Sequence, residues 1–96
     1  MNSFLCEAIR NHLELELRYN GYNRVVNPYA CGLNKDGETL LRCFQVAGGS
    51  VSGERTGWKL LKVEEITSMH ATVNTFEIRT EYSRGDKGIF SIDCQA

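Results

Sequence analysis

The chain has 96 residues, of which 42% are hydrophobic and 24% charged, and its formal net charge at pH 7 is -1. This length suits one compact domain with a modest core, so we expect residues 1–96 to form a single domain. The charge balance excludes a strongly basic domain that coats duplex DNA nonspecifically. No apolar run approaches the roughly 20 residues of a membrane helix, and residues 1–10 lack a signal-peptide pattern. We therefore expect a cytoplasmic protein without membrane contact.

The four cysteines are widely spaced along the chain, at Cys6, Cys31, Cys43 and Cys94. Zinc sites usually contain closely spaced cysteine pairs, and structural disulfides are typical of exported proteins. Cys31 and Cys43 fall in apolar, strand-like segments, where cysteine behaves as a small hydrophobe. We predict free buried thiols, with no metal site and no cofactor.

The N-terminal third predicts a helix followed by a β-hairpin. Leu5, Ala8 and Ile9 have helical spacing, and Ser3 is placed to cap the first turn. Residues 12–19 then alternate apolar and polar side chains, which is typical of a half-buried strand. Asn20-Gly21 favours a tight type I′ turn into the next strand.

The rest of the chain predicts further short strands separated by polar or glycine-rich turns. Pro28 marks an edge, a bulge or a bend in the second strand, and Glu64-Glu65 favours a helical corner. The remaining strands are expected at residues 39–46, 58–63, 73–80 and 89–94, with turns at 32–37, 48–57 and 83–88. No second helix offers a parallel crossover, so we expect a mainly β fold. The specific expectation is a small antiparallel barrel of five or six strands preceded by one short helix.

Three segments resemble those of a WYL domain, a Sm-like, SH3-type β-barrel of bacterial transcriptional regulators and antiviral-defence proteins. The first is Arg18-Tyr19 before a tight turn. The second, residues 24–29 (RVVNPY), looks like the family's R-x-V-x-P segment, and the third, residues 59–66 (KLLKVEEI), looks like its R-x-F-x-L-D-R-I segment. The likeness spans Leu5 to Ile66 and implies a bacterial or phage protein.

The chain departs from the family's pattern at several positions. Only the Leu of the Trp-Tyr-Leu triplet survives, in Thr39-Leu40-Leu41, and Lys59 replaces the arginine of the closing segment. Glu65 stands where the family has an arginine, and the usual helix-turn-helix is absent. We interpret the chain as a short, stand-alone member.

The resemblance implies a ligand-binding face that is both basic and aromatic. Cations can hold phosphate, and flat rings can stack on bases. The candidate residues are Arg24, Lys59, Arg42, Arg18, Tyr22, Tyr29 and Trp58. The alternative for the same residues is structural, with a solvated Arg18 and a Trp58 that plugs the barrel.

Strand parity singles out Arg42 among these candidates. In a regular strand it shares a face with Leu40, Phe44 and Val46, whereas Leu41, Cys43 and Gln45 share the other. A cation among apolar groups needs an ionic partner, access to the rim or an anionic ligand. This pattern favours a functional Arg42.

Two functional hypotheses follow. The first is a non-catalytic, regulatory module that binds a single-stranded nucleic acid or a nucleotide-like anion. The alternative is a module that homo-oligomerises or docks on a larger protein partner, with residues 89–94 as the candidate strand edge. An enzyme has the least support, because His12 and His70 stand alone and adjacent glutamates do not oppose one another as catalytic carboxylates do.

Overall fold

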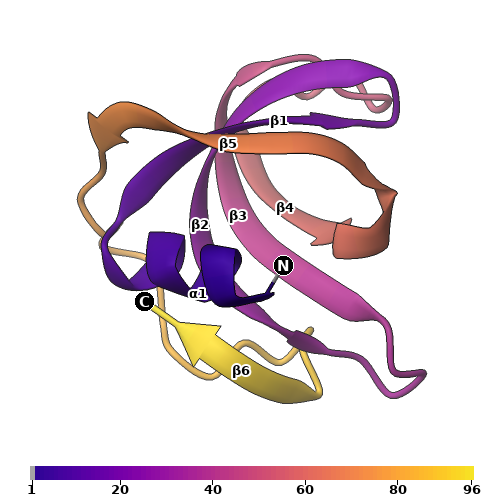
Figure 1. Cartoon of the computed structure of the whole chain (residues 1–96), viewed down its shortest axis with the longest axis vertical. Coiled ribbons are helices and arrows are strands. Elements are labelled where there is room, and N and C mark those ends of the chain that lie inside the picture. The colour runs from indigo at the N-terminus through magenta and orange to yellow at the C-terminus, as the bar shows by residue number, and fades with distance from the viewer. Residues whose placement is uncertain (1) are drawn as a thin grey trace.

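The computed structural model describes residues 2–96, which form one α-helix, one short 3₁₀ helix and a six-stranded antiparallel sheet (Figure 1). The elements in chain order are α1 (Asn2–Arg10), β1 (Leu13–Tyr19), β2 (Tyr22–Leu33), β3 (Thr39–Gly48), β4 (Gly57–Lys62), the 3₁₀ helix η1 (Val63–Glu65), β5 (Ile66–Thr75) and β6 (Ser91–Gln95). The expected mainly β, antiparallel architecture with one short helix is confirmed.

The sheet is built around β2. Strand order is β4-β3-β2-β1-β5, and β6 pairs with β2 outside this path. The first half of β2 pairs with β1, and its second half, Ala30 to Leu33, pairs with β6. A register shift against β3 between Pro28 and Ala30 confirms that the proline marks an irregularity. Asn20 and Gly21 both have positive φ, at 51° and 81°, as the type I′ turn requires.

The main core lies between α1 and one face of the sheet. Leu5, Ala8 and Ile9 are buried as the helical spacing predicts, and they pack in one cluster with Leu15 and Leu17 of β1. The expected N-cap was wrong, because the helix already includes Ser3.

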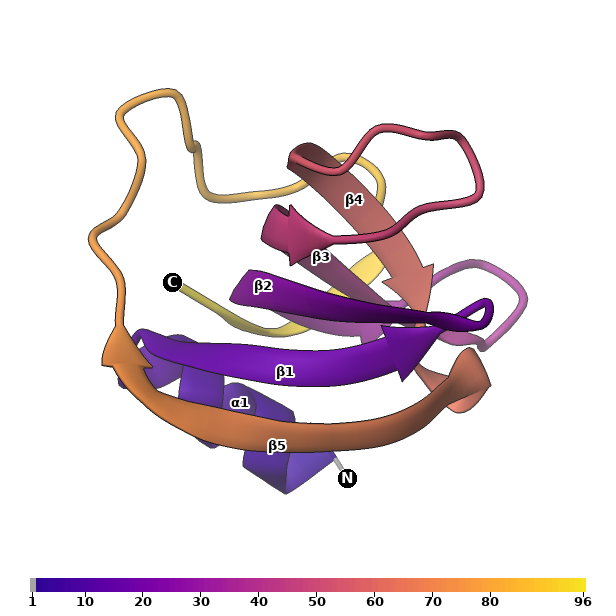
Figure 2. The same cartoon turned by 90° about the horizontal axis from the view of Figure 1, so that it is seen from above.

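A second layer covers the opposite face of β2 and β3. The residues between β5 and β6, 76–90, run along this side, and Figure 2 shows them across the sheet from α1. Ile89 from this segment packs with Ala30 and Leu40 in a smaller buried cluster. The strand expected at 73–80 was wrong for residues 76–80, because β5 ends at Thr75. Residues 81–87 of this connecting segment form one wall of the site described below.

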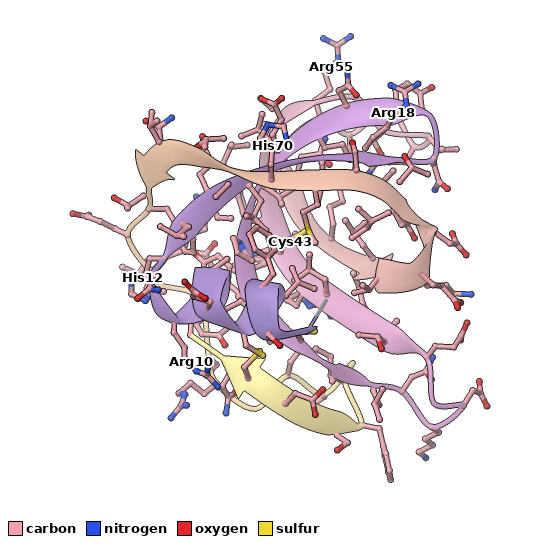
Figure 3. The ribbon with its side chains drawn as sticks, viewed as in Figure 1. Arg10, His12, Arg18, Cys43, Arg55 and His70 are labelled. Atoms are coloured by element: carbon pink, nitrogen blue, oxygen red, sulfur yellow. A yellow bond between two sulfur atoms is a disulfide. The ribbon has the colours of Figure 1, made fainter. Side chains whose placement is uncertain are left out.

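Two cysteines contradict the prediction of free thiols. Cys6 on α1 and Cys94 on β6 form a disulfide, visible as a yellow bond in Figure 3, with their Cα atoms 5.5 Å apart. Cys31 and Cys43 are free and buried, as predicted. The expected cytoplasmic location, which argued against a bridge, did not predict this contact, because the fold brings the two ends of the chain together. No helix within residues 2–96 is long and apolar enough to cross a bilayer.

Candidate functional site

A pocket of about 360 Å³ opens between β4 and the segment that joins β5 to β6. We call it the 81–87 pocket, because residues 81–87 line it together with Arg42 and Trp58. Its volume lies in the range of small-molecule sites, which combine apolar walls with a few polar groups.

Aromatic side chains form one side of the 81–87 pocket. The rings of Trp58 and Tyr82 are 6.2 Å apart between centroids and inclined by only 25°. Tyr29 is fully buried beneath them, with its centroid 4.7 Å from each. The Tyr82 hydroxyl donates to the Tyr29 carbonyl at 3.4 Å, and burial raises the pKa of that hydroxyl. These contacts place the nearly parallel rings of Trp58 and Tyr82 over the buried ring of Tyr29.

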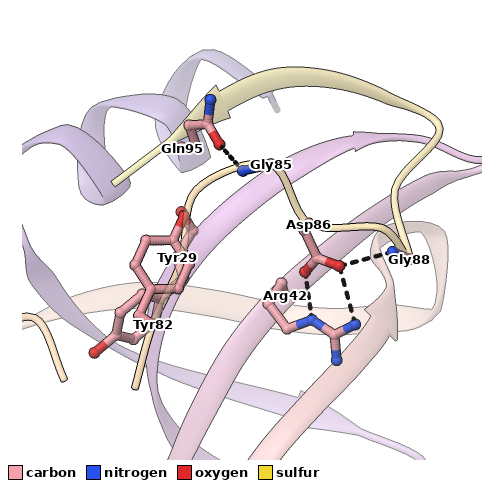
Figure 4. Close-up of polar contacts among 7 residues, drawn as sticks. All are labelled: Tyr29, Arg42, Tyr82, Gly85, Asp86, Gly88 and Gln95. Carbon is pink, nitrogen blue, oxygen red and sulfur yellow. Dashed lines mark hydrogen bonds and ion pairs between the residues drawn. The ribbon is translucent and has the colours of Figure 1, made fainter. Parts of the chain in front are cut away.

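An ion pair fixes the opposite side of the pocket. Arg42 donates from Nε to Asp86 Oδ2 at 2.6 Å and from Nη2 to Oδ1 at 3.3 Å (Figure 4). The Gly88 amide also donates to Oδ1, at 2.8 Å. The Arg42 hydrogen bonds are the main cause that lowers the pKa of Asp86, and partial burial opposes them. Asp86 is therefore a carboxylate at neutral pH, and it supplies the ionic partner that strand parity required for Arg42.

A second carboxylate at the pocket is also paired with an arginine. Glu81 binds Arg79 and accepts a hydrogen bond from Trp58 Nε1 at 3.3 Å. The Arg79 hydrogen bond is the first cause of the lowered pKa of Glu81. The Arg79 guanidinium lies 4.0 Å from the centroid of Phe44, on the same aromatic wall. Both pocket carboxylates are thus held by arginines, whereas Arg84 and Lys87 are exposed at the rim.

The candidates from the sequence separate onto two faces of the sheet. Phe44 is the register partner of Trp58, and Cys43 is the partner of Lys59. Directly opposed residues share a face, and Arg42 shares a face with Phe44 because alternate residues of a strand point the same way. Trp58 and Arg42 therefore lie on the pocket side of the sheet, and Lys59 lies on the Cys43 side. Cys43 is fully buried. The structure therefore joins Arg42, Trp58 and Tyr29 but does not bring Arg24 or Lys59 to them.

Arg24 is a buried residue and not part of an exposed binding face. Its side chain is only 3% exposed. It donates to the Tyr19 carbonyl at 3.1 Å and to Gln45 Oε1 at 3.4 Å, and it lies over the Tyr19 ring. Its Nε has no hydrogen-bond partner among residues 2–96. These contacts give Arg24 a structural role in the hairpin.

The other cationic and aromatic candidates lie outside the pocket. Lys59 Nζ donates to the Glu54 carbonyl at 2.9 Å and to Ser50 Oγ at 3.4 Å, which ties down the glycine-rich loop. Arg18 is exposed and donates to Asn23 Oδ1 at 3.0 Å. Tyr22 is 42% exposed and lies against Gly49.

Sequence reasoning missed Tyr82, Arg84, Asp86 and Lys87. Two signals pointed to them. One was the unassigned anion that Arg42 needed, and the other was an aromatic residue followed by basic residues in a glycine-containing turn, Tyr82 to Lys87.

No protein-family model, curated protein or solved structure matches the chain. Among the residues that the structure describes, no group of three His, Cys, Asp or Glu side chains could hold a metal ion.

Proposed function

We propose that this protein is a non-catalytic binding module, and that the 81–87 pocket binds a small ligand with a flat ring and an anionic group, such as a nucleotide. The observation that carries the proposal is the meeting of two nearly parallel rings, Trp58 and Tyr82, with the exposed cations Arg84 and Lys87 in one pocket. Aromatic faces stack on any nucleobase, and an arginine fork grips phosphate with two hydrogen bonds.

The charge of the pocket lining supports an anionic ligand. Three cations (Arg42, Arg84 and Lys87) line it with two carboxylates (Glu81 and Asp86), which leaves a net charge of +1. Glu81 also has Arg79 as its partner. A ligand phosphate at the rim would therefore meet cations whose charge the two carboxylates do not cancel.

The size of the pocket favours a single nucleotide over a long strand. A single-strand groove needs a basic track with several successive stacking platforms. Here Trp58 and Tyr82 form one platform in one pocket, and the other proposed cations, Arg24 and Lys59, belong to the opposite face. A nucleic acid would engage this site through one base and its phosphate.

Membership of the WYL family and its Sm-like, SH3-type barrel remain part of the proposal. Within residues 2–96 the sheet is not closed, but the 3₁₀ turn that joins its two edge strands, β4 and β5, supports a curved, barrel-like arrangement. A regulatory role in transcription or defence follows from the resemblance alone. The ligand site proposed here differs from the family-based one, because residues 81–87 lie outside the resembling region.

The test is a titration with adenosine monophosphate, followed by the fluorescence of Trp58, the one tryptophan. We expect saturable binding that weakens as salt rises. The Arg84→Ala, Lys87→Ala double variant should lose about tenfold or more in affinity, about 1.4 kcal/mol. Arg55→Ala, an exposed arginine outside the pocket, is the matched control and should bind normally. No saturation at millimolar nucleotide, or equal affinity in the double variant, would contradict the proposal.

One observation favours a second candidate function, protein association through β5. Among residues 2–96 this strand pairs only with β1. It has no Asp, Glu, Lys or Arg in its ten residues, and it is flanked by an apolar pocket containing Phe4, Ile66 and Met69. Edge strands without charges are prone to pair with other chains. Sedimentation velocity should then show a concentration-dependent mass that Ala71→Lys abolishes. A mass that stays monomeric at all concentrations excludes self-association.

A further inference from the structure

We propose that the Cys6–Cys94 disulfide is a reversible clamp that holds the 81–87 pocket in its binding form, so that a dithiol reductant lowers the affinity of the pocket. The bond joins α1 to β6 across 88 positions of sequence. This inference rests on the proposed function for its ligand readout, but its structural part is tested separately.

A chain of contacts connects the disulfide to the pocket. Gln95 follows Cys94, and its Oε1 accepts a hydrogen bond from the Gly85 amide at 2.8 Å (Figure 4). Gly85 precedes Asp86, and both residues line the pocket. The Ala96 amide donates to the carbonyl of Tyr29, the buried ring beneath Trp58 and Tyr82, at 2.7 Å. The position of β6 therefore sets the position of the wall that carries Gly85 and Asp86.

The other attachments of β6 to the sheet are limited. Within the described part of the chain it pairs with β2 alone, over Ala30 to Leu33, and that pairing is interrupted by a register shift between Cys31 and Gly32. On its other side the disulfide fixes it covalently to α1, which belongs to the main core. Short terminal strands with few backbone pairs open at low free-energy cost. Breaking the bond should therefore loosen β6, and with it residues 79–88, before the core.

The surroundings of Cys6 give a reductant access. Cys6 lines an open pocket of about 580 Å³ together with Glu7, Arg10 and Asp93. A dithiol of the thioredoxin class can attack Cys6 Sγ through its thiolate and expel the Cys94 thiolate. The second reductant thiol then attacks the mixed disulfide and releases the Cys6 thiolate. The protein gains two electrons and two protons to form two thiols, and the reductant becomes a disulfide.

The remaining cysteines do not compete for this chemistry. Burial raises the pKa of the Cys31 thiol to about 11 and that of the Cys43 thiol to about 12. Both stay protonated near neutral pH, and only the thiolate attacks a disulfide. This separation matters for Cys31, because it is the register partner of Cys94. In compartments buffered by reduced thiols, bonds of this kind are transient and redox-sensing.

The experiment compares oxidised and dithiothreitol-reduced protein in two measurements. The first is amide hydrogen exchange, in which reduction should speed exchange at Gly85 and Gly88 but not at Val26 in the main core. The second is the adenosine monophosphate titration, in which reduction should weaken affinity by about fivefold or more. The Cys6→Ser, Cys94→Ser variant should behave as reduced protein in any buffer. The Cys31→Val, Cys43→Val variant is the matched control and should keep the full response.

Each outcome decides a separate part of the proposal. Unchanged exchange at Gly85 on reduction overturns the clamp, whatever the ligand result. Faster exchange at Val26 as well as Gly85 also overturns it, because the bond would then hold the whole fold. Faster exchange at Gly85 alone, without nucleotide binding in either state, supports the clamp and contradicts the proposed function. Local loosening with unchanged nucleotide affinity overturns the regulatory part of the inference.

Discussion

The Arg42 guanidinium holds the Asp86 carboxylate through two hydrogen bonds, across 44 positions of sequence. Arg42 lies on β3, and Asp86 lies in the segment that covers the outer face of the sheet. Because Gly88 and Gln95 add their own contacts on either side of this pair, the ion pair is central to the attachment of residues 85–88. The same contact shapes the pocket and stabilises the fold.

Replacing Asp86 should show this structural role directly. Asp86→Asn keeps the shape but removes the charge and one acceptor, and it leaves Arg42, whose side chain is 25% exposed, without its ionic partner. We expect the free energy of unfolding to fall by about 1–3 kcal/mol, measured by urea unfolding. Glu54→Gln, at an exposed loop position, should change it by less than about 0.5 kcal/mol. Equal stability of Asp86→Asn and the wild type would show that the pair contributes nothing.

The same carboxylate predicts an acid-sensitive contribution to stability. Arg42 lowers the pKa of Asp86 below its ordinary value of 3.8. The folded state therefore binds this proton less readily than the unfolded state. The resulting stabilisation is complete above about pH 5 and is lost as the pH falls through 3.8 and then through the lower pKa of the folded protein.

The measurement is urea unfolding of wild type and Asp86→Asn across this acid range. We expect the stability difference between them to be largest near neutral pH and to shrink below about pH 4. Glu81 and Glu38 also have lowered pKa values, but they are present in both proteins and cancel in the comparison. A difference that stays constant with pH would mean that the charge of Asp86 is not what stabilises the fold.

The sequence predicted the elements whose signals are local. The alternation of apolar and polar residues predicted β1, and Asn20-Gly21 predicted the hairpin turn. The helical spacing of apolar residues predicted the buried face of α1. Parity in β3 was also correct, since Leu41, Cys43 and Gln45 are all buried on one face. Each of these signals lies within one turn or one strand, so it does not depend on the rest of the fold.

The errors concern contacts between distant parts of the chain. The disulfide and the Asp86 partner of Arg42 join residues 88 and 44 positions apart, and no local pattern specifies such pairs. The burial of Arg24 was missed for a related reason. Its burial follows from how β1, β2 and β3 meet, because the guanidinium reaches Tyr19 and Gln45 on the neighbouring strands.

Arg24 should therefore behave as a stability residue. Arg24→Ala leaves the Tyr19 carbonyl and Gln45 Oε1 without these donors, so we expect a loss of about 1–3 kcal/mol in the free energy of unfolding. Arg18→Ala, on the exposed side of the same hairpin, is the matched control and should cost less than about 0.5 kcal/mol. Where Arg24→Ala remains folded, its affinity for adenosine monophosphate should match the wild type. A selective loss of affinity at unchanged stability would instead restore Arg24 to the ligand site.

Gly32 offers a test of how β6 is seated, independent of the cysteines. A Cβ at this position would overlap the Ser91 carbonyl oxygen and come within 2.9 Å of the Ile92 Cα. Both are backbone atoms of β6, so the strand itself has to move. Gly32→Ala should cost about 1–3 kcal/mol through overpacking and should speed amide exchange at Gly85 and Ala96.

Gly37→Ala is the control for that variant. Gly37 has a φ of 81°, and a Cβ added there would have no atom within 4 Å, so alanine is strained but meets nothing. It should cost about 1–2 kcal/mol because of the left-handed backbone, yet leave exchange at Gly85 and Ala96 unchanged. If both variants speed amide exchange at Gly85 equally, the faster exchange results from the lower global stability of the fold. If only Gly32→Ala does so, the seating of β6 against β2 controls the wall of the pocket.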